Sequence, residues 1–538
     1  MRQVVSGLGV VLVVTMLIAV AAGGATAAPR TSQYLVVFKS GHSGQGVKAV
    51  KQAGGKILGI NKIGVGTVSS VRADFAARLR ATGRVSAVAR HAAWRQASVG
   101  PARSLQTAEL TPSEAITGCN AFFTPQAGTV GPDPLNVCQW GNRSVKATIG
   151  GGSYGFNQGD GVKIGIIDTG LDLVHEDIRP NLNVALSCSF IRPGNPTALP
   201  QEVDATNFPS GANGPFSGAC ATKSAVQDYN GHGTHVGGTA AAPINGLGIS
   251  GIAPRATLVG LKAGSAQGFF FTQEVVDALV YAGDKGIDVV NMSFFADPWL
   301  FNCRGDGEQQ AIIKAISRAS SYAAQRGVVQ VSSAGNELID MDHPPDQDED
   351  SPNFPPGSSV PRDIGNNCVI LPHELPNVAT ITAIGPRHIL ASYSNTSNSK
   401  VENTAPGGDA GQSPGFTWGR ILSSYSSTAP AFPASRSVVQ CTGPGGTPPC
   451  FRYVWLSGTS MAAPHASGVA ALIRRNHPGL PALAVIAMLQ RTAQPMACTP
   501  AAEAYTGRDC TGNTNPASSG QTNFYGNGLV DALLAGTS

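Results

Sequence analysis

Residues 456–465 read Leu-Ser-Gly-Thr-Ser-Met-Ala-Ala-Pro-His, a turn of small residues that leads into an apolar helical run. The turn places Ser460 at or near the N-terminus of the expected helix. Free backbone N–H groups and partial positive charge at such an end favour an oxyanion that forms beside the serine. Because a serine hydroxyl is a poor nucleophile without a base, the rest of the chain should hold a histidine and a carboxylate in special surroundings.

Two upstream stretches supply these partners. Residues 163–170, Lys-Ile-Gly-Ile-Ile-Asp-Thr-Gly, are typical of a buried parallel strand that ends in Asp168. Residues 230–239, Asn-Gly-His-Gly-Thr-His-Val-Gly-Gly-Thr, place His232 in a glycine-rich turn that enters a helix. Active sites of parallel α/β folds lie at the carboxyl ends of the strands, where Asp168 falls. The order along the chain is Asp168, His232, Ser460.

These three stretches resemble the signature motifs of the subtilisin-like serine proteases (subtilases), which share this chain order. The resemblance covers about 161–535. It implies a serine endopeptidase in which Ser460 is the nucleophile, His232 the general base and then acid, and Asp168 the residue that orients the imidazole. The segment that ends in Asn336 is similar to the oxyanion-hole strand of the family. The implied role of its amide is to donate to the oxyanion beside the backbone N–H of Ser460.

Each of these residues alone has an ordinary structural interpretation, but three in matched contexts favour catalysis. His235, one helical turn after His232, could suggest a metal site, and we interpret it as a structural part of the motif. A binding protein on a retained protease scaffold is one alternative, against which the four intact positions argue. An esterase is another, but it requires a G-x-S-x-G turn and a different chain order.

Helix-period segments alternate with apolar strands after residue 161. The alternation predicts an α/β domain with a doubly wound parallel sheet. The expected strands are 163–167, 257–262, 287–293, 328–333 and 378–384, and the expected helices are the one at His232, 273–285, 308–325 and 482–491.

The first 27 residues read as a secretory signal peptide. Arg2 precedes an apolar run over 4–22, and Ala-Thr-Ala at 25–27 is a small-x-small cleavage site; an uncleaved membrane anchor is the alternative. All ten cysteines lie after residue 100, and an even count in an exported protein suggests disulfides. Connectivity does not follow from sequence; our guess is neighbour pairing, 119–138, 188–220, 303–368, 441–450 and 498–510. We therefore expect a secreted, extracellular protein without stable membrane association.

Residues 28–100 follow a strand–helix–strand–strand–helix–strand pattern, the plan of a small α+β ferredoxin-like domain. The expected elements are 34–39, 46–53, 56–63, 66–71, 73–81 and 84–89. This domain resembles the inhibitory propeptide of subtilases. The resemblance implies a zymogen that cuts itself within about 90–106 and a catalytic domain over 101–538, with the propeptide as a partner.

The net charge is divided between these two parts. Of the total of +4, residues 29–100 contribute +11 and Arg2 one more, which leaves −8 on residues 101–538. Opposite charges suggest that the two parts attract each other. We do not expect nucleic-acid binding, because the basic residues form no block and are interleaved with a globular pattern.

Three short segments are expected to bind a protein or peptide substrate. Lys262, Ala263 and Gly264 resemble the strand that pairs with an extended substrate. Ser333, Ala334 and Gly335 resemble one wall of the primary specificity pocket. Ser293, Phe294 and Phe295 resemble the other wall, but the family has small residues there. The two phenylalanines either narrow the pocket or point into the core, which puts the common preference for large apolar residues in doubt.

The chemistry requires no cofactor. Family members often carry structural calcium, and the acidic stretch 340–350 offers oxygen ligands, but a solvated acidic loop is the interpretation that we favour. Long Pro/Gly-rich segments at 186–226, 340–363 and 432–451 should shape the rim of the cleft. They make a processing peptidase with few substrates an alternative to a broad degradative one. We expect a monomer.

Overall fold

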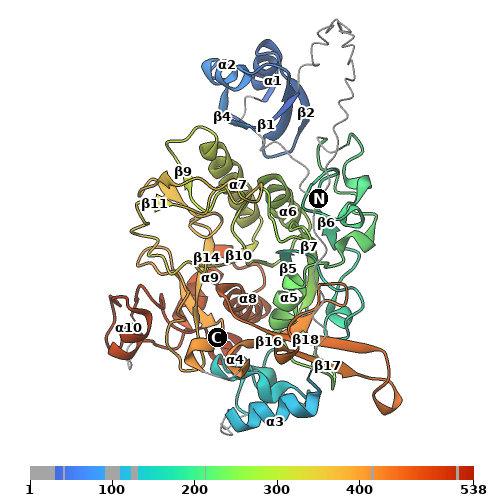
Figure 1. Ribbon diagram of the computed structural model, residues 1–538, viewed down its shortest axis with the longest axis vertical. Coiled ribbons are helices and arrows are strands. Elements are labelled where there is room, and N and C mark those ends of the chain that lie inside the picture. The colour runs from blue at the N-terminus through green and yellow to red at the C-terminus, as the bar shows by residue number, and fades with distance from the viewer. Residues whose placement is uncertain are drawn as a thin grey trace, which may run out of the picture.

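The computed structural model describes residues 31–39, 43–90, 110–122, 131–211, 214–413, 417–515 and 520–538. The predicted signal peptide and nearly all of the predicted self-cleavage segment, 91–106, lie outside these residues. A small N-terminal α+β domain sits on two helices of a large α/β domain (Figure 1).

The small domain contains four antiparallel strands and two helices in the predicted order. The strands pair in the order β2-β3-β1-β4. One sheet face, with Val36 and Phe38, packs on the domain's own helices through Phe75 and Leu79. The elements are β1 (Ser32–Phe38), α1 (Ser43–Gln52), β2 (Lys56–Ile60), β3 (Val65–Ser70), α2 (Phe75–Ala81) and β4 (Val85–Arg90).

A seven-stranded parallel sheet forms the centre of the large domain. Its strand order is β15-β14-β10-β8-β5-β7-β6, which confirms the doubly wound parallel sheet. The five predicted strands are present, and β6 and β15 were not predicted. The strands are β5 (Lys163–Asp168), β6 (Cys188–Ser189), β7 (Thr257–Lys262), β8 (Val289–Met292), β10 (Val329–Ser333), β14 (Val378–Ile384) and β15 (Asn403–Pro406).

Helices cover both faces of this sheet (Figure 1). Alternate residues of β5 divide between two apolar cores: Ile164 and Ile166 face one, and Ile167 faces the other. The first core contains α5 (His232–Ala241) and α8 (Thr459–Asn476), and the second contains α6 (Thr272–Asp284) and α7 (Gln309–Gln325). Because both faces are covered, the strands read as continuous apolar runs.

The small domain packs on α6 and α7 through the outer face of its sheet. Leu35, Val37 and Ala87 share the core that contains these helices. Cations of α7 also bind the backbone of the small domain: Arg318 donates to the carbonyl of Phe38 at 2.8 Å, and Lys314 donates to that of Ser86 at 2.9 Å.

The five disulfides confirm the neighbour pairing of the ten cysteines. Among the described residues, no helix combines the length and the apolarity needed to span a membrane. The remaining elements are α3 (Pro112–Phe122), α4 (Trp140–Ser144), β9 (Asn302–Cys303), β11 (Gln347–Asp348), β12 (Arg362–Asp363), β13 (Cys368–Val369), β16 (Ile421–Tyr425), β17 (Ser437–Cys441), β18 (Cys450–Leu456), α9 (Ala482–Arg491), α10 (Pro500–Thr506) and α11 (Ala532–Thr537).

Candidate active site

Asp168 and His232 meet at the carboxyl end of the parallel sheet. Asp168 ends β5 and is fully buried, and His232 begins α5. Nδ1 of His232 lies 2.8 and 3.0 Å from the two carboxylate oxygens of Asp168. Because a carboxylate only accepts hydrogen bonds, Nδ1 carries the proton, and in the neutral ring Nε2 is free to act as a base.

The surroundings of His232 act on its pKa in opposite directions. Burial lowers the pKa of the imidazole, whereas the charge of Asp168, the hydrogen bond to it and the charge of Asp228 raise it. The net result is a pKa above the ordinary value of 6.5.

A second buried carboxylate, Asp228, fixes the turn that carries His232, and the sequence analysis missed it. One of its oxygens accepts the N–H groups of Asn230 and Gly231 at 2.9 Å, and the other accepts the N–H of Thr234 at 2.9 Å. Gly231 has a φ of 100°, and a Cβ at this position would lie 2.2 Å from the ring of Tyr425. The turn therefore requires glycine immediately before the histidine. The sequence did contain a signal for Asp228, because aspartate is typical at the start of a turn.

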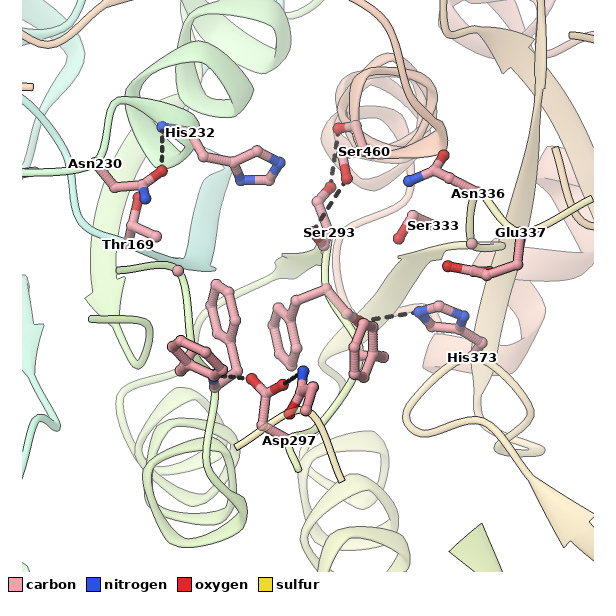
Figure 2. Close-up of a pocket in the computed structure, with 17 residues that line it drawn as sticks. Thr169, Asn230, His232, Ser293, Asp297, Ser333, Asn336, Glu337, His373 and Ser460 are labelled. Atoms are coloured by element: carbon pink, nitrogen blue, oxygen red, sulfur yellow. Dashed lines mark hydrogen bonds between the residues drawn. The ribbon is translucent and has the colours of Figure 1, made fainter. Parts of the chain in front are cut away.

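Ser460 lies in the first turn of α8 and faces the same cavity as His232 (Figure 2). Its hydroxyl donates to the carbonyl of Ser293 at 3.2 Å, and the hydroxyl of Ser293 donates to the carbonyl of Ser460 at 3.0 Å. In the described part of the chain, no hydrogen bond joins the Ser460 hydroxyl to His232. Such contacts are often absent in substrate-free enzymes and form only with substrate bound.

Asn336 follows the end of β10 and points its amide nitrogen toward Ser460 (Figure 2). Thr459 fixes this orientation, because its N–H and its hydroxyl both donate to the Asn336 amide oxygen, at 2.8 and 3.0 Å. The same hydroxyl accepts the N–H of Gly335 at 3.1 Å. Thr459 is a second residue that the sequence analysis missed, although its position directly before Ser460 was a signal.

His232, Ser460 and Asn336 border one cavity of about 360 Å³. Both predicted pocket walls contribute to it through Ser293, Phe294, Phe295, Ser333 and Gly335. The complete lining is Thr169, Asn230, His232, Gly268, Phe269, Phe270, Ser293, Phe294, Phe295, Asp297, Ser333, Gly335, Asn336, Glu337, Asn353, His373 and Ser460.

The two unusual phenylalanines form a wall of this cavity. Phe294 is 6% exposed and stacks on Phe270, with ring centroids 4.2 Å apart and an interplanar angle of 3°. Phe295 is partly buried and packs against a neighbouring apolar cluster. The predicted alternatives therefore both hold in part, because the rings contact the core and also line the cavity.

Four predicted substrate-binding residues do not line the cavity, and for Lys262 the prediction is wrong. Its side chain is fully buried, and its Nζ lies 2.7 Å from a carboxylate oxygen of Glu202. The strand edge is also occupied, because Phe190 donates its N–H to the Lys262 carbonyl at 2.8 Å. The N–H groups of Ala263 and Gly264 both donate to the Asp168 carbonyl at 3.0 Å, and Ala334 is fully buried.

Two carboxylates of the acidic stretch 340–350 already bind other groups of the protein. Asp342 accepts hydrogen bonds from the serine hydroxyl at 397 and the backbone N–H at 398. Asp348 pairs with Arg362 at 2.5 Å. Across the described residues, no group of three acidic, histidine or cysteine side chains could hold a metal ion. His235 likewise faces backbone carbonyls, at 3.0 and 3.2 Å, as its structural interpretation requires.

The sequence pattern of the Subtilase family matches residues 159–528. The chain is 26% identical over 377 residues to M-protease from Shouchella clausii (strain KSM-K16), a match that covers 70% of this chain and 64% of M-protease. It is 29% identical over 336 residues to subtilisin DY from Bacillus licheniformis, covering 62% and 85% of the two chains.

Solved structures share the fold. The epidermin leader peptide processing serine protease from Staphylococcus aureus superposes with a TM-score of 0.61 at 19% identity, over 94% of this chain and 97% of that one. Fervidolysin from Fervidobacterium pennivorans superposes with a TM-score of 0.58 at 19% identity, over 95% of this chain and 61% of that one.

Proposed function

This chain belongs to the subtilase family of serine proteases, and from that premise we propose that it is a secreted serine endopeptidase made as a self-processed zymogen. One observation carries the proposal. Asp168, His232, Ser460 and Asn336 come from four separate segments, and the structure brings them together at the carboxyl end of one parallel sheet, the last three around a single cavity.

Each group has a proposed role in peptide-bond hydrolysis. Nε2 of His232 takes the proton of Ser460 as its Oγ attacks the carbonyl carbon of the substrate. The oxyanion accepts hydrogen bonds from the Asn336 amide and the backbone N–H of Ser460. The imidazolium, stabilised by Asp168, then protonates the leaving amine. Water then attacks the acyl-enzyme while His232 takes its proton. The imidazolium returns that proton to Oγ of Ser460 as the acid product leaves.

The small domain is proposed to be the inhibitory propeptide. Its last strand ends at Arg90, whose N–H donates to Glu308 at 3.3 Å. Arg90 also lines a second cavity, of about 200 Å³, which shares Asp297 with the active-site cavity. Arg90, the last described residue of the small domain, therefore lies beside a cavity that adjoins the cleft, which supports the proposal that self-cleavage occurs in the segment that follows.

Export is proposed from two independent features. The signal peptide pattern occupies the first 27 residues, and all ten cysteines form disulfides. Disulfides form and persist in oxidising compartments outside the cytosol.

A fluorophosphonate tests the proposed activity on the purified chain. We expect the wild type to cut unfolded casein at internal bonds and the reagent to stop this cleavage, because it traps only an activated serine. Mass spectrometry should locate the adduct on Ser460. An adduct elsewhere, or cleavage that survives complete labelling of Ser460, would contradict the proposal.

Asn336→Ala should lower kcat by roughly 10²–10³ with little change in KM, because the amide stabilises charge that develops only in the transition state. Thr459→Val should lower kcat by a smaller factor, about 10, because it removes one of the two hydrogen bonds that orient the amide. Steady-state kinetics on one peptide measures both. Thr447→Val, in an exposed loop, is the matched control. A KM effect without a kcat effect would exclude the oxyanion role.

A further inference from the structure

We propose that the active-site cavity selects a cationic side chain, arginine or lysine, at the residue before the cleaved bond, and that Glu337 is the group that pairs with it. This inference rests on the proposed protease function and specifies its substrate class.

In the described ranges, the cavity lining contains acidic side chains without basic partners. Among the described residues that line it, Asp297 and Glu337 are the only Asp, Glu, Lys or Arg side chains. Within the described part of the chain, neither carboxylate has a Lys or Arg nitrogen within 4.0 Å. Buried carboxylates elsewhere in the protein do have such a partner, among them Asp277 with Arg192 at 2.6 Å and Glu374 with Lys400 at 2.7 Å. The cavity therefore presents negative charge without an internal counter-ion.

Hydrogen bonding distinguishes the two carboxylates. Both oxygens of Asp297 are already bound, one to the backbone N–H of Phe270 and the other to the Asn353 amide at 2.6 Å. Burial also raises the pKa of Asp297 to about 7, so a large fraction is neutral near that pH. Glu337 accepts a side-chain hydrogen bond from the Asn395 amide at 2.7 Å, and among the described residues no other side chain donates to it. Glu337 is thus the group available to a ligand.

The backbone is built to hold Glu337 in this place. The Asn395 amide oxygen accepts the N–H of Glu337 at 3.1 Å, so one side chain binds both its backbone and its carboxylate. Gly335 has a φ of 102°, and a Cβ there would lie 2.6 Å from a carboxylate oxygen of Glu337. Glycine at this position leaves room for the carboxylate, which points into the cavity (Figure 2).

The position of Glu337 relative to the oxyanion donors identifies the substrate residue. Asn336 and the N–H of Ser460 fix the carbonyl group of the residue before the cleaved bond. Its side chain therefore enters the cavity beside Asn336, and Glu337 is the next residue of that wall. Phe294 and Phe295 line the cavity and suit the apolar stem and planar head of arginine.

His373, a histidine in the cavity lining, does not oppose a cation. His373 donates through Nε2 to the carbonyl of Phe294 at 2.9 Å, and burial lowers its pKa to about 4, so it is neutral. Partial burial raises the pKa of the Glu337 carboxyl, whereas the hydrogen bond from Asn395 and nearby backbone N–H groups lower it, and the net direction is upward. A carboxylate that has lost part of its hydration gains more from a bound cation than a fully solvated one.

The chain contains matching candidate sites for its own processing. The only Lys or Arg residues in the predicted self-cleavage segment, 90–106, are Arg90, Arg95 and Arg103. Since Arg90 is held in β4, we expect the mature chain to begin after Arg95 or Arg103.

Two peptides that differ only in Arg or Leu before the cleaved bond test the proposal on the mature enzyme. The wild type should favour Arg in kcat/KM by roughly 10- to 100-fold, the range for one charge-assisted contact. Glu337→Gln should remove most of this preference and leave the Leu peptide almost unchanged. Glu349→Gln, the same change at an exposed residue that does not line the cavity, should leave the ratio unaltered.

Further outcomes separate the two proposals. If Glu337→Gln fails to fold, Glu337→Asp, which keeps the charge, should still favour Arg. A wild type that cuts the Leu peptide as well as the Arg peptide, or an equal loss for both peptides in Glu337→Gln, would overturn the selectivity while the protease activity stands. A wild type that cuts neither peptide and takes no fluorophosphonate at Ser460 would overturn both.

Discussion

Ser460→Ala is expected to reduce peptide cleavage by roughly 10⁶-fold in kcat, which leaves only the weak contribution of binding and the oxyanion hole. The nucleophile is the one atom for which the site holds no substitute, since the neighbouring hydroxyl of Ser293 donates to a backbone carbonyl. The variant should also keep its N-terminal domain, because self-processing uses the same serine. Intact mass and a fluorogenic peptide assay measure both effects.

The matched control is Ser210→Ala, a serine in an exposed loop, which should process and cleave like the wild type. Equal unfolding midpoints for Ser460→Ala and wild type would show that the fold is retained. If the variant sheds its N-terminal domain and cleaves at the wild-type rate, Ser460 is not the nucleophile. The alternative of a binding protein on a protease scaffold would then be the one to pursue.

Most of the central sheet could be predicted because its strands are buried on both faces and read as apolar runs. The two strands that were missed lack this pattern. β6 contains only Cys188 and Ser189, and β15 reads Asn-Thr-Ala-Pro over 403–406. Both lie at the edges of the sheet, where pairing with a neighbour rather than side-chain pattern defines the strand. Tertiary context determines such strands, and a local sequence window does not contain it.

The sequence also predicted the catalytic residues that the structure brings together. It did not predict that Lys262, expected to bind substrate, is already paired within the protein. Motif position placed Asp168, His232, Ser460 and Asn336 at the ends of elements that converge. It could not show that Lys262 pairs with Glu202, a residue of the long segment 186–226 whose path the sequence does not specify. Nor could it show that Thr459 orients Asn336, since that contact joins segments 123 residues apart.

Asp168→Asn is expected to lower kcat by about 10⁴-fold while the geometry of the site is kept. An asparagine that donates its amide to Nδ1 would favour the tautomer with the proton on Nε2, which cannot accept the proton of Ser460. The charge that stabilises the imidazolium is lost as well. In the wild type this charge helps to raise the pKa of His232 above 6.5, so activity should fall as the pH drops through that raised value.

The pH profile distinguishes this role from a structural one. Removing the Asp168 charge should move the acidic limb of kcat/KM to lower pH, because burial of the imidazole then acts with less opposition. Asp160→Asn, at a partly exposed aspartate that pairs with Arg255, should change neither the rate nor the acidic limb. A merely structural Asp168 would lower the unfolding midpoint and leave the limb in place. A variant with wild-type rate and an unshifted limb would therefore remove Asp168 from the mechanism, whereas a shifted limb with a retained fold identifies its charge as the cause.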